Sequence, residues 1–151
     1  KTYKKFAHME MKDIYGEDKL NDGFKLSATR FETVYLENIG NGGFRVNDLP
    51  NEAQTGPTMS FLTKDFNKDG FIDILGVGAI YDAEVETIRY DSNYGYVLLG
   101  DGKGAFNYAR EYDPFIDSDS KDIAEIKING DSYFIVVSNN ASLDIFGFDP
   151  Q

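Results

Sequence analysis

The sequence predicts an all-β fold with a short helical segment at its N-terminal end. Three observations carry this prediction: 15 glycines alongside many Asn and Asp residues, short apolar runs, and a hairpin pattern that occurs twice. Glycine, Asn and Asp are the residues that tight turns require, and frequent turns between short apolar runs are typical of β proteins. A chain of 151 residues is long enough for one domain with a substantial core.

Residues 1–30 differ from the rest and predict the helical segment. Apolar side chains recur near helical spacing over residues 3–15, and Gly16 is expected to end the helix. A short turn at 17–20 and a short strand at 25–29 are expected to follow. We expect this segment to pack on the strands predicted for residues 31–151, which should form a single domain built of propeller blades, as argued below from a repeated hairpin.

From residue 31 onward the pattern predicts three groups of strands. The expected strands are 32–39 and 43–48, then 58–64, 72–79, 94–100 and 105–112, and finally 123–128, 133–137 and 143–146. Gly-rich turns at 40–43 and 100–104 separate two of the pairs, and Asn129-Gly130 is a strong hairpin signal for a third.

Two of these hairpins resemble each other. Residues 34–44 and 97–106 both read as an apolar strand, a Gly-rich turn and then Phe. A repeated unit of four short strands, which cannot bury its faces alone, indicates the blades of a β-propeller. Because a closed propeller typically has about four to eight blades, the three groups of strands would make about two to three blades of an incomplete ring.

The most informative stretch begins at residue 65. Side-chain oxygens occupy its first, third, fifth and ninth positions: Asp65, Asn67, Asp69 and Asp73. The alternation directs the first three at one centre, and Gly70 permits a positive φ that turns the Phe71 carbonyl inward as well. Oxygen donors without His or Cys suit a hard cation, which predicts Ca²⁺ rather than Mg²⁺. The alternative is an acidic surface turn that binds nothing, because Asn, Asp and Gly also dominate ordinary turns.

Two other kinds of calcium loop share this opening. An EF-hand needs a bidentate Glu at its twelfth position and flanking helices, but Gly76 stands there and residues 72–77 read as a strand. A dockerin-type loop would also run into a helix, and no helical period follows Asp73. The predicted arrangement is therefore a strand, a calcium loop and a second strand.

The loop at 65–74, together with residues 95–106, resembles an FG-GAP/VCBS repeat, the unit of integrin-type β-propellers. The wider run over 31–148 is similar to the C-terminal part of secreted bacterial VCBS-repeat proteins related to the ASPIC/UnbV group. The resemblance implies Ca²⁺ held by the four side chains named above and the Phe71 carbonyl, and it brings no catalytic residue. It also implies a secreted, periplasmic or outer-surface location. We therefore expect the chain to be part of a larger propeller, docked on missing blades or self-associating through exposed edges.

Composition excludes several classes of function. The formal charge of -11 disfavours nucleic-acid binding, because phosphates demand a basic face. The absence of cysteine excludes disulfides and thiolate zinc sites. No apolar run approaches the roughly 20 residues that a membrane span requires.

Two functions remain open. The leading expectation is a non-enzymatic calcium-binding module of a secreted or cell-surface protein, acting in protein or carbohydrate binding or as a scaffold. The alternative is a polysaccharide-active hydrolase or lyase that uses an acidic loop, although solvated loops of this kind usually have no catalytic role. The acidic residues concerned are Asp82, Glu84, Glu86 and Asp91. Tyr90, Tyr94 and Tyr96 have ring faces suited to stacking on a sugar, but core packing or cross-strand pairing is the favoured explanation for them.

Overall fold

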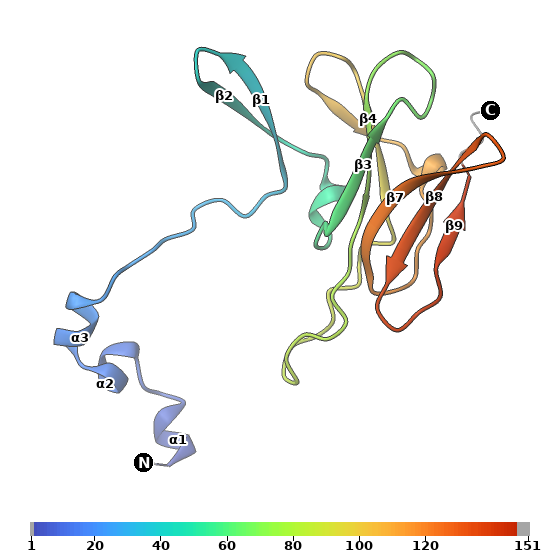
Figure 1. The fold of residues 1–151 in the computed structure, drawn as a ribbon. Coiled ribbons are helices and arrows are strands. Elements are labelled where there is room, and N and C mark those ends of the chain that lie inside the picture. The colour runs from blue at the N-terminus through green and yellow to red at the C-terminus, as the bar shows by residue number, and fades with distance from the viewer. Residues whose placement is uncertain (1, 148–151) are drawn as a thin grey trace. The chain divides into compact units, whose positions relative to one another are not determined.

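The computed structural model describes residues 2–147, and the chain divides into two compact units, Lys1–Phe31 and Glu32–Gln151 (Figure 1). The helices α1 to α3 belong to the first unit, and every described strand belongs to the second. Within residues 2–147, no helix has the length and apolar character needed to cross a membrane.

The N-terminal unit contains three short helices: α1 (Tyr3–Phe6), α2 (Met11–Tyr15) and α3 (Glu17–Asp22). Glu10 caps α2, and its backbone amide donates to the Asp13 carboxylate at 2.9 Å. Gly16, at a φ of 84°, ends α2 as predicted. The continuous helix expected before Gly16 is instead two short helices. Neither buries a residue, so neither gains the packing energy that usually stabilises a helix.

The short strand predicted at 25–29 is wrong. These residues are exposed and have no regular secondary structure, and no sheet in the described part of the chain includes them. A single short run does not hold a strand conformation without a hydrogen-bonded neighbour, whatever its local propensity.

The second unit contains three antiparallel sheets. The two-stranded sheet consists of β1 (Val34–Gly40) and β2 (Gly43–Asp48). The four-stranded sheet runs in chain order through β3 (Ser60–Lys64), β4 (Asp73–Val77), β5 (Tyr96–Gly100) and β6 (Phe106–Tyr108). The three-stranded sheet consists of β7 (Ser120–Ile128), β8 (Asp131–Ser138) and β9 (Asp144–Phe146). The 3₁₀ helices η1 (Asn51–Gln54) and η2 (Arg110–Tyr112) follow β2 and β6. This architecture confirms the all-β prediction for this part of the chain.

The turns explain why the strands begin and end where they do. Gly40, at the end of β1, has a φ of 83°, and Asn41 and Gly42, between β1 and β2, have φ angles of 51° and 74°. Asn129 and Gly130 adopt 54° and 98° between β7 and β8. Positive φ at both central residues is what a two-residue hairpin needs, and Asn and Gly tolerate it best. The Asn-Gly hairpin prediction is therefore confirmed.

The main core lies between the four-stranded and three-stranded sheets. Its buried side chains are Phe66, Leu75, Val77, Val97, Ile116, Ile123, Phe134 and Val136. Phe66 and Phe134 meet edge to face across this core, with ring centroids 5.6 Å apart. Leu75 and Val77 alternate with Ile74 along β4, as a strand requires, so that Ile74 belongs to the opposite face of the sheet.

A smaller core covers that opposite face. Ala53, Tyr96 and Leu98 are buried there. Leu49, which follows β2, and Phe106 of β6 pack against them. Because both faces of the four-stranded sheet carry a core, β5 is buried at four of its five positions.

Candidate functional site

The predicted calcium loop connects β3 to β4. Lys64 and Asp73 are directly paired across these antiparallel strands, so residues 65–72 form the loop between them. A strand therefore stands on each side of the loop, which confirms the predicted arrangement of elements and excludes flanking helices. Gly70 has a φ of 91°, the positive value predicted for it, and Lys68 has a φ of 62°.

Asp65 folds the loop back on itself. Its Oδ1 accepts the Asp69 amide at 3.1 Å, and its Oδ2 accepts the Gly70 amide at 2.9 Å. One carboxylate thus holds two successive amides on the far side of the loop. These bonds are formed by a charged acceptor, which makes them stronger than bonds between neutral groups.

Asn67 and Asp69 join the same network. Asn67 Oδ1 accepts the Asp69 amide at 3.0 Å, and its Nδ2 donates to Asp69 Oδ2 at 2.9 Å. Asp69 Oδ1 accepts the Phe71 amide at 2.8 Å. The structure therefore brings three of the predicted ligand side chains, Asp65, Asn67 and Asp69, together in one loop.

Asp73 is placed differently. It is fully buried, with Oδ2 accepting the Phe66 amide at 2.8 Å and Oδ1 accepting the Gly100 amide at 3.0 Å. Its carboxylate thus ties the start of the loop to the end of β5. An ionised carboxylate has about four lone-pair sites, so these two bonds leave acceptor capacity on both oxygens.

The donor set fits a hard cation in chemistry but does not form a preassembled cage. Within residues 2–147, no three His, Cys, Asp or Glu side chains come close enough to hold a metal ion together. The oxygens of Asp65, Asn67 and Asp69 accept amides of their own loop. Those of Asp73 accept the amides of Phe66, at the start of the loop, and Gly100, at the end of β5. Coordination by the full predicted set remains a prediction, and it requires the unused lone pairs of these oxygens to converge.

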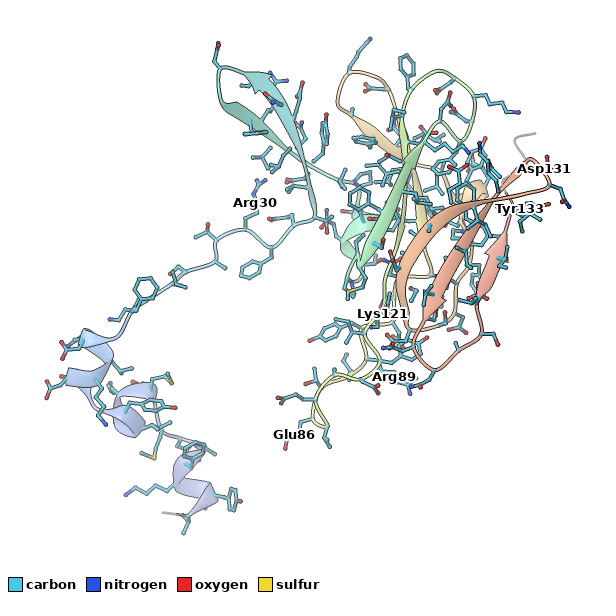
Figure 2. The ribbon with its side chains drawn as sticks, in the orientation of Figure 1. Arg30, Glu86, Arg89, Lys121, Asp131 and Tyr133 are labelled. Atoms are coloured by element: carbon cyan, nitrogen blue, oxygen red, sulfur yellow. The ribbon has the colours of Figure 1, made fainter. Side chains whose placement is uncertain are left out.

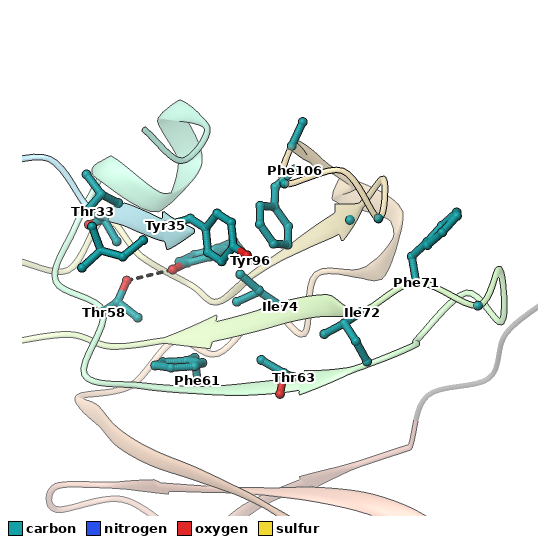
Figure 3. Close-up of a pocket in the computed structure, with 17 residues that line it drawn as sticks. Thr33, Tyr35, Thr58, Phe61, Thr63, Phe71, Ile72, Ile74, Tyr96 and Phe106 are labelled. Atoms are coloured by element: carbon teal, nitrogen blue, oxygen red, sulfur yellow. Dashed lines mark hydrogen bonds between the residues drawn. The ribbon is translucent and has the colours of Figure 1, made fainter. Parts of the chain in front are cut away.

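An apolar groove of about 710 Å³ adjoins the loop (Figure 3). It lies between β1 and the face of the four-stranded sheet that carries the smaller core. Tyr35 of β1 meets Phe106 of β6 edge to face, with centroids 5.4 Å apart, and the Tyr96 and Thr58 hydroxyls are hydrogen-bonded at 2.9 Å (Figure 3). Ile72, from the end of the loop, also lines the groove and is 58% exposed. The loop and the groove are therefore parts of one surface.

The acidic loop of the alternative function lies in irregular chain after β4. A bridge between Ile80 and Tyr90 closes its base, and Glu86 lies near its far end (Figure 2). The side chains of Asp82, Glu84, Glu86 and Asp91 are all exposed. Arg89 lies over the Tyr81 ring, 4.7 Å from its centroid. These surroundings are those of an exposed, solvated loop.

A polar cluster around the buried Asp119 was not predicted. Lys121 Nζ bridges its Oδ1 and the Ala79 carbonyl, at 2.7 and 2.6 Å, and Asn139 donates to its Oδ2 at 3.1 Å. Burial alone would raise the pKa of Asp119, but the hydrogen bonds from Lys121, Asn139 and the Tyr81 amide hold it below its usual value. The cluster ties the start of β7 to the segment after β4. No sequence signal identifies it, because its members come from three separate stretches.

Tyr108 and Asp113 form a second unpredicted polar pair. The Tyr108 hydroxyl donates to Asp113 Oδ2, and this bond raises the pKa of Tyr108 to about 12. Burial raises the pKa of Asp113, and the bonds from Tyr108 and from the Val97 amide partly offset that effect. The pair holds the segment after β6 against β5.

The chain matches no known protein-family model, no curated protein and no solved structure. The resemblance to FG-GAP/VCBS repeats therefore stays a prediction from the sequence.

Proposed function

We propose that this chain is a calcium-stabilised, non-enzymatic binding module of the β-propeller type, from a secreted or cell-surface protein. The observation that carries the proposal is the loop between β3 and β4. It combines an oxygen-only donor pattern with a closely turned backbone and a strand on each side.

In this proposal Asp65, Asn67, Asp69 and the Phe71 carbonyl hold Ca²⁺, and Asp73 completes the set. The ion supplies positive charge that offsets repulsion between neighbouring carboxylates. The protein supplies a loop that Asp65 has already folded back. Ca²⁺ would therefore stabilise the junction of β3 and β4 and take part in no reaction.

The strand order supports the propeller part of the proposal. β3 to β6 form a sequential antiparallel sheet of four strands, which is the composition of one propeller blade. By the sequence repeat, β1–β2 corresponds to β5–β6 and so to the second half of a preceding blade. The three strands β7 to β9 would begin a following one. Missing blades or a second copy of the chain would then cover the groove and the open edges.

A calcium titration followed by calorimetry tests the metal role. At a free Ca²⁺ concentration of about 100 times the dissociation constant, binding to the folded state alone adds about 2.7 kcal/mol to the free energy of unfolding. We expect Asp69→Ala to abolish this increment and Asp82→Ala, on the exposed acidic loop, to retain it. Melting that does not respond to Ca²⁺, or an increment that survives Asp69→Ala, would contradict the proposal.

Light scattering tests the partner role separately. The groove and open edges predict self-association, or binding of a dye that reports exposed apolar surface. A stable monomer of 17.0 kDa that binds no such dye would count against docking on further blades.

A further inference from the structure

A second cavity, of about 470 Å³, lies beside the segment between β6 and β7. It is bounded by η1, by residues 92–96 and by residues 108–115, and it shares only Tyr96 with the lining of the groove under β1. Its lining combines exposed aromatic rings with charged side chains, chiefly Tyr94, Phe115, Glu52, Arg110 and Asp113. The calcium proposal uses none of these residues.

Two aromatic side chains form an exposed stack at this cavity. The Tyr94 and Phe115 rings are nearly parallel, at 12°, with centroids 5.2 Å apart. Phe115 is 73% exposed and Tyr94 is 43% exposed. Most large aromatic side chains gain stability by burial, which Phe115 largely forgoes and Tyr94 forgoes in part.

The backbone holds this stack in place. Phe115 has a φ of 50°, a left-handed conformation that is uncommon for a bulky residue and costs energy. The next residue holds that conformation in place. The Ile116 side chain is buried in the main core, and the Ile116 amide donates to the Tyr94 carbonyl at 2.7 Å. On the other side, Pro114 lies so close to Gly95 that a Cβ there would stand 2.5 Å from Pro114 Cγ. The rings are therefore preorganised, which lowers the entropic cost of binding a ligand.

Charged groups stand around the stack. The Asp113 carboxylate, which accepts from the Tyr108 hydroxyl and the Val97 amide, is held at a defined place in the lining. Glu52 and Arg110 line the same cavity, and Arg110 is exposed. The cavity therefore offers hydrogen-bond acceptors from carboxylates and a planar set of donors from a guanidinium.

From this arrangement we infer that the cavity binds a neutral polysaccharide. A sugar ring presents a face of C–H groups that packs on an aromatic ring, and its edge carries hydroxyls that donate to carboxylates and accept from guanidinium. The net charge of -11 opposes uronic-acid polymers, so a neutral glycan is favoured. The inference rests on the proposed binding function and names its ligand.

Sedimentation with insoluble polysaccharides and affinity electrophoresis with soluble ones test the inference. The neutral panel is cellulose, chitin, xylan, mannan and starch, and polygalacturonate is the acidic comparison. We expect at least one neutral polysaccharide to bind and polygalacturonate not to bind. Phe115→Ala should weaken that binding roughly tenfold or more, because the exposed stacking face is lost.

Phe115→Asn is the second variant, because Asn tolerates a left-handed backbone and keeps the fold while removing the ring. Phe44→Ala, which removes another exposed Phe, from β2, is the matched control and should bind as the unmodified chain does. Binding to no neutral polysaccharide overturns the inference, as does binding that Phe115→Asn leaves unchanged. The calcium-dependent melting increment should be the same in all these variants, so failure of the metal role is detected independently.

Discussion

β1–β2 and β5–β6 are two hairpins of similar sequence in very different surroundings. β5 is hydrogen-bonded to β4 on one side and β6 on the other, and four of its five residues are buried. Among the described residues β1 pairs with β2 alone, and none of its seven residues is buried. The comparison teaches that the local sequence specifies a hairpin, whereas the elements around it decide how much of it is buried.

The same comparison bears on the proposed function. If β1–β2 is the second half of a blade, the strand that plays the part of β4 would pair with the open edge of β1. The apolar groove between β1 and the four-stranded sheet would then receive side chains of that strand. The energetic consequences can be measured by changing equivalent kinds of residue in the two hairpins.

The largest difference is expected for leucine truncation. Leu98 in β5 is fully buried, whereas Leu36 in β1 is 54% exposed. Leu98→Ala should lower the free energy of unfolding by about 2–5 kcal/mol, because it removes buried apolar atoms and leaves a cavity. Leu36→Ala should cost less than about 1 kcal/mol in the isolated chain. Urea unfolding measures the free energy of unfolding of both variants, provided that their m-values are equal. Similar losses in the two variants would contradict the view that β5 is far more deeply packed than β1.

A smaller difference is expected for glycine substitution. A Cβ at Gly100, at the end of β5, would stand 2.2 Å from the Ile72 carbonyl oxygen, so Gly100→Ala should cost about 3 kcal/mol by forcing the backbone apart. Gly40, at the end of β1, has no atom within 4 Å of such a Cβ, although its φ is 83°. Gly40→Ala should cost only about 1 kcal/mol, from the left-handed conformation. Thermal melting compares the two variants. A larger loss of stability for Gly40→Ala than for Gly100→Ala would contradict the view that β5 is tightly packed and β1 is not.

The smallest expected effect is a local response to acid. Asp101 Oδ1 accepts the Lys103 and Ala105 amides at 2.7 and 3.0 Å, and these bonds lower the pKa of Asp101 below the usual 3.8. A lowered folded-state pKa means that the stabilisation is present above the unfolded value and is lost as pH falls through the folded value. The β5–β6 turn should therefore loosen in acid below pH 3.8.

The β1–β2 turn provides the control for this titration. The Gly40 amide donates to Asn38 Oδ1 at 2.9 Å, and an amide side chain does not titrate. Amide chemical shifts should thus follow a carboxylate titration at Lys103 and Ala105 but not at Gly40. A titration of equal size at Gly40 would show that the response is global unfolding rather than loss of the Asp101 bonds.

Much of the fold could be predicted because its signals are local. Gly70 and the Asn129-Gly130 pair take the positive φ angles that their turns require. The three groups of strands follow from apolar runs between such turns. The strand at 25–29 could not be judged this way, because a strand needs a hydrogen-bonded neighbour and its sequence does not say whether one is present.

The candidate site was predicted less completely. The spacing of Asp65, Asn67 and Asp69 within one loop correctly indicated that these side chains lie together. Asp73 was assigned to the same set at the ninth position, but its buried carboxylate accepts the Gly100 amide across the sheet. The sequence singled out Tyr94 as one of three tyrosines with a ring face suited to a sugar, but it did not indicate the stack with Phe115, because the two rings come from segments separated by β5 and β6.

By itself, the sequence determined the positions of the hairpin turns, the three groups of strands after residue 31, and which oxygens share one loop. Each of these depends on backbone conformations only a few residues apart. The tertiary structure alone decided that Asp73 is buried between Phe66 and Gly100, that β5 is covered on both faces while β1 is not, and that Phe115 is exposed beside Tyr94. Those outcomes depend on which distant segments come into contact, since burial and hydrogen bonding are properties of the neighbours a residue acquires on folding.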